Sequence, residues 1–460
     1  MNKKISTLQS RRTFIHQLTA GAVGVAVAPF ILPSRVWSAP TGPNEKLTLG
    51  FIGMGKQAQG LLPGFIGRQD TQVLAVCDVD TNRRNAAKKR VDEYYSNANC
   101  AAYNDFRELI ARKDIDAVVV ATPDHWHAIP TLAALRAGKD VYCEKPLTHN
   151  IHEAVEVMKA VDANKRILQT GSMQRSMKEF RIACELVRNG VIGKISHVEC
   201  AFGDPGKPCD LPQEAAEPGL DWNMWCGPAP LHAYNSNLCP RGECKSFPHW
   251  RDYKEYGSGS VGDWGAHHLD IAQWGLGMDE SGPVEVIAAS KPTDLRGCKL
   301  VYANGIFVEH QDKAKGFGVH FHGANGEVKV NRGKFVLVVD GKMIAEYTEG
   351  RRKPGDPAPT RETSCAVEVQ KAEKAFLKNP KIQLYASKNH LSDFVECVKS
   401  RKKPITSEIV GGHSAICCHL VNQSYYHHAG FKWDPAKSEF VGGTGDPKWL
   451  TRDYRSPWVV

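Results

Sequence analysis

Beyond residue 38 the sequence lacks any apolar stretch long enough to span a lipid bilayer. It also lacks a polybasic run, although the 460-residue chain has a formal net charge of +9. The first 38 residues contain no acidic residue and five basic ones: Lys3, Lys4, Arg11, Arg12 and Arg35. Nine minus five leaves +4 for the rest of the chain. We therefore expect no nucleic-acid partner and no membrane span in the mature chain.

Cysteine patterns typical of structural zinc sites are missing as well. No Cys-x-x-Cys pair stands with histidines at zinc-finger spacing, so we expect no structural zinc. Of the 14 cysteines, Cys77 and Cys143 end apolar runs and Cys417-Cys418 lie in an apolar helical pattern, where thiols are usually small apolar side chains. Four others share one loop, the best place for a disulfide: Cys209, Cys226, Cys239 and Cys244.

The first 38 residues have the layout of an export signal. Arg11 and Arg12 stand directly before an apolar run, residues 18–32, that small residues interrupt. This layout is typical of a twin-arginine signal, which directs folded proteins to the twin-arginine translocase. We therefore expect a protein that is periplasmic or otherwise exported by this route. A weak cleavage pattern near residue 39 leaves the processing of the signal open.

The rest of the chain is too long for one compact core and predicts two domains. From residue 46, short apolar runs (47–53, 72–77, 117–121, 140–143 and 166–169) alternate with helical patterns (58–68, 82–95, 127–137 and 151–163). Continuous apolar strands separated by helices indicate a parallel sheet covered on both faces. Residues 46–170 are therefore predicted to form an α/β, doubly wound Rossmann domain.

Residues 171–460 predict an α+β domain with an antiparallel or mixed sheet. Its strand-like runs are 194–202, 284–289, 305–310, 318–322, 326–330 and 335–339, and helical patterns return at 390–399 and 413–427. A loop rich in proline and tryptophan, residues 205–259, interrupts this domain. Loops of that length inside a folded domain are usually lids or docking surfaces.

A glycine turn predicts a nucleotide site at the end of the first strand. Gly53, Gly55 and Ala58 follow this strand and open the first helix, an arrangement that brings backbone N–H groups to a pyrophosphate. Asp78 ends the second strand, 25 residues after Gly53, where a carboxylate can accept hydrogen bonds from ribose hydroxyls. This favours NAD, whereas Arg83 and Arg84 leave NADP open.

Two further strand ends carry polar side chains. Thr122, Pro123 and His127 follow the strand predicted at 117–121, and Glu144-Lys145-Pro146 follows the strand predicted at 140–143. Ligands of open parallel sheets bind at the carboxyl ends of the strands. We therefore expect the two turns to meet over one crevice, with Lys145 beside the nicotinamide.

At these residues the chain resembles the glucose–fructose oxidoreductase, inositol dehydrogenase and MocA family (Gfo/Idh/MocA). The resemblance rests on the motifs quoted above and extends from residue 46 to about 430. It implies a Rossmann domain followed by an α+β domain whose large open, mainly antiparallel sheet often forms a homo-oligomer. Members of this family often have asparagine where Asp124 stands.

The second domain supplies a segment, residues 262–270, that resembles the active-site helix of this family. Asp263 and His267 stand four residues apart and share a face if a helix begins there. Oxidation of a secondary alcohol needs a base for the hydroxyl proton. His267, with its ring oriented by Asp263, and Lys145 are the catalytic candidates, and the sequence leaves open which of them takes the proton.

The sequence gives weaker signals for the residues that contact a substrate and for residues that could bind a metal ion. Arg175, Arg251, Tyr253 and His268 are candidate contacts to a carbohydrate substrate. In the segment 262–270 only Asp263 and His267 have the spacing of two ligands on one helix, and we expect no metal site.

Together these features predict an exported oxidoreductase that transfers a hydride between a sugar or cyclitol-like alcohol and a nicotinamide cofactor. Because no free NAD(P) pool exists outside the cytoplasm, we expect the cofactor to stay tightly bound. One alternative is a glycosidase that oxidises its sugar transiently with bound NAD, as some relatives of the family do. Another is a non-catalytic sugar-binding protein on the same fold, against which the joint presence of Lys145, Asp263 and His267 argues.

Overall fold

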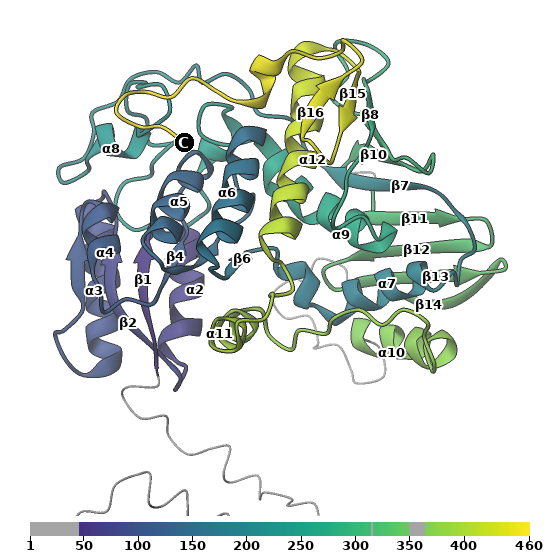
Figure 1. Ribbon diagram of the computed structural model, residues 1–460, viewed down its shortest axis with the longest axis horizontal. Coiled ribbons are helices and arrows are strands. Elements are labelled where there is room, and N and C mark those ends of the chain that lie inside the picture. Colours follow the sequence, from purple (N-terminus) through teal and green to yellow (C-terminus); the bar gives the residue numbers. More distant parts are fainter. Residues whose placement is uncertain (1–45, 314–315, 349–363) are drawn as a thin grey trace, which may run out of the picture. The chain divides into compact units, whose positions relative to one another are not determined.

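The computed structural model describes residues 46–313, 316–348 and 364–460 (Figure 1). The predicted export signal, residues 1–38, lies outside these ranges. Within them, no helix combines the length and the apolar character that crossing a membrane requires.

The first sheet is six-stranded and parallel, in the order β3-β2-β1-β4-β5-β6. Its strands are β1 (Leu47–Ile52), β2 (Thr71–Cys77), β3 (Ala101–Tyr103), β4 (Ala117–Val120), β5 (Asp140–Cys143) and β6 (Leu168–Thr170). The helices between them are α2 (Lys56–Ile66), α3 (Thr81–Tyr95), α4 (Phe106–Ala111), α5 (Ala128–Arg136) and α6 (Ile151–Asn164). The strand order reverses between β1 and β4, which is where a crevice opens in such sheets. The predicted Rossmann topology is confirmed.

The second sheet has ten strands, in the order β14-β13-β12-β11-β7-β10-β9-β8-β15-β16. They are β7 (Ile195–Phe202), β8 (Glu285–Ile287), β9 (Lys299–Val301), β10 (Phe307–Asp312), β11 (Val319–Gly323), β12 (Gly326–Asn331), β13 (Lys334–Val339), β14 (Lys342–Thr348), β15 (Phe431–Asp434) and β16 (Glu439–Val441). Neighbouring strands in this sheet run antiparallel, except β7 and β10, which run parallel. The predicted α+β class is therefore confirmed, as a mixed and mainly antiparallel sheet.

One face of this sheet packs on helices. The large core contains alternate strand residues, such as Val198, Phe321 and Val328, together with side chains of α7 (Lys178–Arg188), α9 (Ala266–Leu276), α10 (Cys365–Phe376) and α12 (Glu408–His427). The residues between them in sequence point to the opposite face. This alternation is what made the strands recognisable in the sequence.

The predicted boundary at residue 170 separates the two sheets but not the two cores. Helix α11 (His390–Ser400) packs Phe394 and Val398 into the same core as Phe51 and Phe65 of the Rossmann domain. Near the end of the chain, Trp458 contacts the Trp126 ring at 4.7 Å between ring centroids. Segments late in the sequence thus complete the first domain.

The long loop, which the sequence analysis named as the best place for a disulfide, contains none. The structure describes all fourteen cysteines, and none of them forms a disulfide, including Cys239 and Cys244 of that loop. Most of them are buried, and burial raises the pKa of Cys239 to about 12, so its thiol stays protonated.

Candidate active site

The long loop between β7 and η6 (Val261–Gly265) folds into a small core of its own. Trp225, Tyr234, Leu238 and Tyr256 are buried there with five other side chains: Cys226, Ala229, Cys239, Trp250 and Tyr253. The loop includes the short helix α8 (Trp222–Cys226) and a bridge from Leu220 to Asp80, next to α3. A segment with its own core can hold side chains in fixed positions over the crevice.

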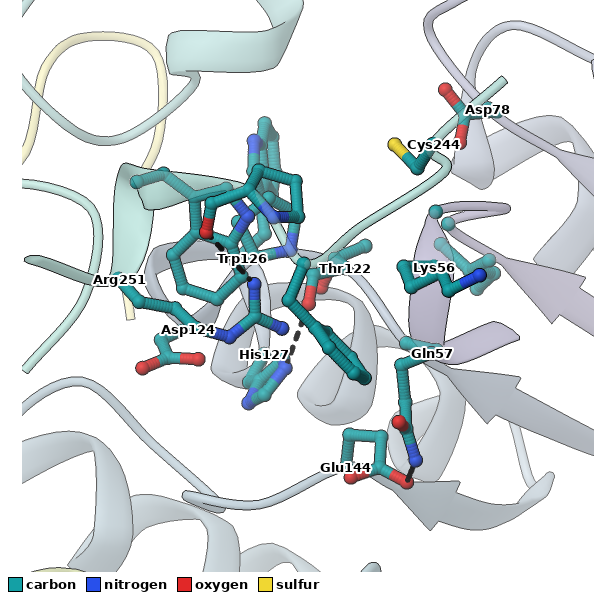
Figure 2. Close-up of a pocket in the computed structure, with 18 of the residues that line it drawn as sticks. Lys56, Gln57, Asp78, Thr122, Asp124, Trp126, His127, Glu144, Cys244 and Arg251 are labelled. Atoms are coloured by element: carbon teal, nitrogen blue, oxygen red, sulfur yellow. Dashed lines mark hydrogen bonds between the residues drawn. The ribbon is translucent and has the colours of Figure 1, made fainter. Parts of the chain in front are cut away.

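A cavity of about 460 Å³ lies between this loop, the strand ends of the Rossmann sheet and the η6–α9 segment. Gly53, Gly55 and Asp78 line it together with Lys145, Asp263 and His267. In Figure 2, Asp78 and Cys244 lie at one end of the view, and Asp124 and Arg251 at the other. The residues predicted for the cofactor and those predicted for the chemistry therefore share one cavity.

The glycine turn leaves room for a ligand along the backbone. Gly53 has a φ of +84°, and a Cβ there would lie 2.7 Å from the backbone nitrogen of Thr122, so only glycine fits. No heavy atom would lie within 4 Å of a Cβ at Gly55, the N-cap of α2. Ala58 does not line the cavity, because its methyl group is buried beneath α2.

Asp78 supports this turn from the end of β2. Its Oδ2 accepts a hydrogen bond from the Met54 N–H at 2.6 Å, and its Oδ1 accepts one from the Asp80 N–H at 2.8 Å. Burial raises the pKa of this carboxyl group, while Arg83 and the two N–H groups oppose the rise. Each oxygen can still accept a further hydrogen bond from the cavity.

His127 joins the two turns that follow β4 and β5. Its Nδ1 lies 2.6 Å from the carbonyl oxygen of Pro146. Its Nε2 lies 3.0 Å from the carbonyl oxygen of Thr122 (Figure 2). Burial lowers the pKa of His127 to about 4, so the ring is neutral at physiological pH. We infer that His127 positions the turns around the cavity.

Glu144 meets a residue that the sequence analysis did not single out. Its Oε1 accepts a hydrogen bond from Gln57 Nε2 at 2.8 Å, across the mouth of the glycine turn (Figure 2). A Cβ at Gly171 would lie 2.6 Å from Glu144 Oε2, so a side chain at this position would displace the carboxylate. Gln57 stands directly after the glycine turn, and this position was the signal that could have revealed it.

Lys145 pairs with Asp263. The Lys145 Nζ lies 2.5 Å from Asp263 Oδ1 and 3.1 Å from the Asp263 carbonyl oxygen. Lys145 and Arg251 together outweigh burial and lower the pKa of Asp263, which is therefore ionised. The expected partnership of Asp263 with His267 is not what the structure shows. Residues 261–265 form a π-helical turn and α9 begins only at Ala266, so the two residues lie in different helical elements.

The partner of His267 is Arg332, which the sequence analysis did not identify. Arg332 Nη2 lies 3.0 Å from His267 Nε2, and its guanidinium stands 5.1 Å from the Trp264 ring. Burial, Lys145 and Arg332 hold the pKa of His267 well below its usual value, so the ring is neutral. Its Nδ1 is buried and makes no hydrogen bond with the described part of the chain. Arg332 directly follows β12, and no motif marks it.

Two further charged residues line the cavity. Asp124 is buried, and this raises its pKa to about 7 although Arg251 and Lys145 act in the opposite direction. Arg251, one of the candidate substrate residues, stacks on Trp250 with 4.2 Å to the ring centroid and lies 3.8 Å from Asp263 Oδ1. Arg251 therefore stays a candidate contact to substrate.

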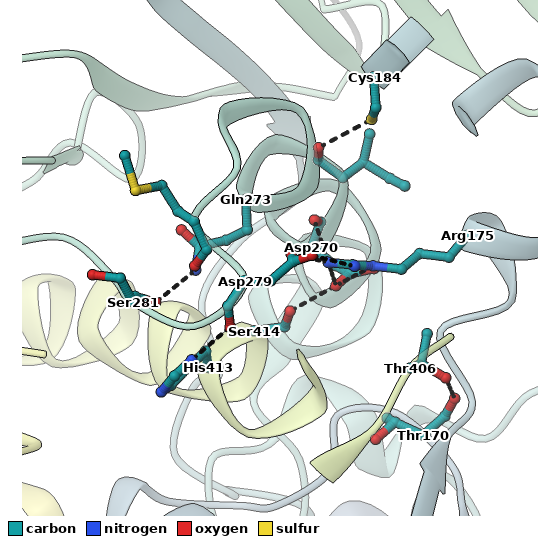
Figure 3. A network of polar contacts seen from close by, with 12 residues as sticks. Thr170, Arg175, Cys184, Asp270, Gln273, Asp279, Ser281, Thr406, His413 and Ser414 are labelled. Carbon is teal, nitrogen blue, oxygen red and sulfur yellow. Dashed lines mark hydrogen bonds and ion pairs between the residues drawn. The ribbon is translucent and has the colours of Figure 1, made fainter. Parts of the chain in front are cut away.

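The other three candidate substrate residues do not line the cavity. Arg175 is 2% exposed and binds Asp270 and Asp279, each at 2.8 Å, in a buried network (Figure 3). Tyr253 is buried in the small core of the loop. His268 Nδ1 lies 2.8 Å from the Ala201 carbonyl oxygen in the large core. The structure therefore does not bring these three side chains to the cavity, and sequence position alone does not show which way a side chain points.

Two models of one protein family match successive parts of the chain. Residues 47–172 match the oxidoreductase family, NAD-binding Rossmann fold (GFO_IDH_MocA), and residues 189–333 match the C-terminal alpha/beta domain of the same family. Together the two matches cover more than half of the 460 residues.

Individual proteins of known name are more distant. A Glycosyl hydrolase family 109 protein of Saccharopolyspora erythraea is 28% identical over 206 residues, which are 40% of this chain and 44% of the relative. An inositol 2-dehydrogenase of Salmonella paratyphi B is 33% identical over 150 residues, 32% of this chain and 43% of the relative. The matches thus span less than half the length of these relatives.

A solved structure extends the likeness in fold. Levoglucosan dehydrogenase, solved in complex with NADH and levoglucosan, superposes with a TM-score of 0.54 at 19% identity and covers 84% of this chain and 99% of its own. At that identity the likeness concerns the fold alone. With both domains matched in order by the models of one family, this chain belongs to the Gfo/Idh/MocA family of oxidoreductases.

Proposed function

We propose that this protein is an exported oxidoreductase that transfers a hydride between a sugar or cyclitol-like secondary alcohol and a tightly bound NAD. The observation that carries the proposal is the single cavity that the glycine turn, Asp78, Lys145 and His267 line together. The inositol 2-dehydrogenase and the levoglucosan dehydrogenase among its relatives support a polyhydroxylated substrate.

The residues at the Asp78 end fit a dinucleotide. Gly53 and Gly55 leave the backbone at the start of α2 free of side chains, and this helix end attracts a pyrophosphate. The side chains of two arginines, by contrast, are engaged within the protein. Arg83 donates to the carbonyl oxygens of Gly242 and Pro240, and Arg84 donates to the Asp78 carbonyl oxygen and to Asn104. NAD is favoured over NADP because neither arginine is free for a 2′-phosphate.

The other end of the cavity fits proton transfer. When it is bound, the nicotinamide supplies the hydride acceptor. Lys145 Nζ, which lies 2.5 Å from Asp263 Oδ1, takes the hydroxyl proton of the substrate as it passes one of its own protons to the Asp263 carboxylate. Arg332 donates to His267 Nε2, so the neutral ring carries its proton on Nδ1 and His267 lines the cavity beside Lys145 as a neutral group.

The experiment is turnover of NAD-loaded protein with a panel of aldoses, ketoses and cyclitols, followed through the absorbance of the reduced nicotinamide. We expect Lys145→Met and His267→Ala each to lower kcat by about 10²–10⁴-fold. Both variants should keep the cofactor, because neither side chain lies at the Asp78 end of the cavity. Lys113→Met, at an exposed position, is the matched control and should turn over like the parent.

Mass spectrometry of small molecules released from natively purified protein identifies the cofactor independently. Release of NAD supports the proposal. Full turnover by Lys145→Met, or loss of cofactor from both active-site variants to the same degree, would contradict the division of the cavity into a cofactor end and a chemistry end.

A glycosidase that oxidises its sugar transiently is the second candidate. The relative at 28% identity is named a Glycosyl hydrolase family 109 protein, and Asp124, with a pKa of about 7, can supply a proton to a leaving group. Release of the chromophore from a chromogenic glycoside, which stops when a reductant consumes the keto intermediate, distinguishes this candidate from a dehydrogenase.

A further inference from the structure

Three histidines and two glutamates gather on the outer face of the ten-stranded sheet. His197 of β7 lies opposite His322 of β11, and Glu199 lies opposite His320. Val198 and Phe321, which alternate with these residues, are buried in the core on the helix side of the sheet. The cluster, completed by Glu327 of β12, therefore faces away from α7, α9 and α12.

The three imidazoles are packed in a column. The rings of His197 and His322 are stacked at 4.0 Å between centroids, and those of His320 and His322 lie 3.5 Å apart. Three imidazoles that meet on one face of a sheet offer several nitrogen donors to one ion.

His322 Nε2 is sealed from solvent and makes no hydrogen bond with any residue that the structure describes. The Glu199 Oε2 atom lies 3.4 Å from it. Two ligands at about 2.0–2.1 Å from a tetrahedral zinc ion stand about 3.4 Å apart. One ligand atom each from His197, Glu199 and His322 can be chosen so that all three lie within 4.8 Å of one another.

The surrounding groups orient these three residues. Ser196 Oγ lies 3.0 Å from His197 Nδ1, which leaves His197 Nε2 for a ligand bond. His320 stands between two carboxylates, with Nε2 at 2.8 Å from Glu327 Oε2 and Nδ1 at 3.3 Å from Glu199 Oε2. Such outer contacts are typical of histidines and carboxylates that hold a metal ion.

Glu327 is less available than Glu199. Its Oε1 pairs with Lys329 Nζ at 2.9 Å, while His320 occupies its Oε2. Glu199 is therefore the glutamate of this cluster whose carboxylate can still bind a cation.

We propose that His197, Glu199 and His322 bind one divalent transition-metal ion, with zinc as the reference metal and a water molecule as the fourth ligand. Two imidazoles and one carboxylate suit zinc or its neighbours in the first row better than magnesium or calcium. The three residues do not line the NAD cavity, so this proposal is independent of the proposed function. The sequence analysis predicted no metal site because these ligands come from strands more than 100 residues apart.

The test is equilibrium dialysis of chelator-treated, full-length protein against zinc, with the metal content measured per chain. We expect one zinc ion per chain, and a visible absorption band when cobalt(II) replaces zinc. His322→Ala and Glu199→Gln should each weaken zinc binding by about 100-fold or more, since losing a ligand costs at least as much as losing an outer contact.

Two matched substitutions serve as controls. His152→Ala on α6 and Glu346→Gln on β14, an exposed position of the same sheet, should keep the full zinc content. Thermal unfolding without metal checks that each variant is folded. If His322→Ala does not fold, the zinc content of the nearly isosteric Glu199→Gln tests the proposal by itself. Parent protein that retains no zinc at micromolar free concentration, or equal retention in Glu199→Gln, would overturn the proposal.

Discussion

Asp124 shows how much a single buried charge costs in this protein. Its usual pKa is 3.8 and burial raises it to about 7. Between these two values the folded protein holds a proton that the unfolded chain has released. The free energy of unfolding therefore falls as the pH rises from about 4 to about 7, and the contribution of this proton is fully lost above that range.

Asp124→Asn should remove this dependence. We expect the cofactor-free variant to match the parent in unfolding free energy near pH 4 and to exceed it by up to about 4 kcal/mol above pH 7. Urea unfolding at a series of pH values measures the difference. Asp252→Asn, at a side chain 53% exposed in the same loop, should leave the profile unchanged. A constant difference between Asp124→Asn and the parent at all pH values would disprove this account.

Arg175 shows how a buried ion pair, rather than a single buried group, contributes to the stability of this protein. Its guanidinium contacts Asp270 and Asp279, and Ser414 donates a further hydrogen bond to Asp270 at 2.8 Å (Figure 3). Removing one partner of a buried pair leaves an uncompensated charge. We expect Arg175→Met to lower the free energy of unfolding by about 3–5 kcal/mol, measured by urea unfolding.

The double variant Arg175→Met/Asp270→Leu should recover part of that loss, because the stranded carboxylate is gone. Arg136→Met, at an exposed position of α5, is the control and should change little. If the double variant were less stable than Arg175→Met by the full cost of a second independent substitution, the two residues would not act as a pair.

At the scale of secondary-structure elements, the π-helical turn at 261–265 supplies the carboxylate of the ion pair in the site. It precedes α9, and Asp263 at its centre contacts Lys145 of the other domain instead of His267. The Asp263 carboxylate therefore pairs with the lysine, and Arg332 is the charged residue that contacts the His267 ring.

Arg83 is one of several residues of the Rossmann domain that hydrogen-bond to the long loop. This side chain, on α3, donates to the carbonyl oxygens of Gly242 and Pro240 next to Cys244, which lines the Asp78 end of the cavity. Hydrogen bonds from charged groups contribute about 1.5–3 kcal/mol each. We expect Arg83→Met to speed cofactor release by roughly 10-fold or more, measured as NAD retained after dilution and filtration.

Arg90→Met, at an exposed position of the same helix, should release NAD at the rate of the parent. Equal release from the parent and Arg83→Met would mean that the loop does not hold the cofactor in place. This outcome would leave the chemistry assigned to Lys145 untouched.

For the whole molecule, we propose that export and cofactor loading are linked. A folded domain closes over its cavity before translocation in the twin-arginine route, so we propose that NAD is bound in the cytoplasm. Arg11→Lys/Arg12→Lys should retain the full-length chain in the cytoplasm, measured by cell fractionation. Lys3→Gln/Lys4→Gln changes charge without touching the arginine pair and should be exported normally. Export of the arginine variant would refute the assignment of the signal.

The homo-oligomer expected through the ten-stranded sheet stays a prediction. The outer face of that sheet carries the ionisable cluster around His322. Any partner on this face would meet polar side chains rather than a continuous apolar surface.

Local patterns were sufficient for the parallel sheet, the glycine turn and the positions of Asp78 and Lys145. In each case neighbouring residues report directly on the feature: apolar runs on buried strands, glycine where the backbone must approach a ligand, and polar side chains at strand ends. Short elements such as β3 and β9 were missed because three residues carry no periodicity.

Tertiary structure alone decided the partners of the charged side chains. Arg175 and Arg251 look alike in the sequence, yet one is buried with Asp270 and the other lines the cavity. Arg332 reaches His267 because β12 ends beside α9, and His197 meets His322 because of strand register. Contacts between residues far apart in sequence depend on how the elements pack, and packing is set by the whole core rather than by the residues that finally meet.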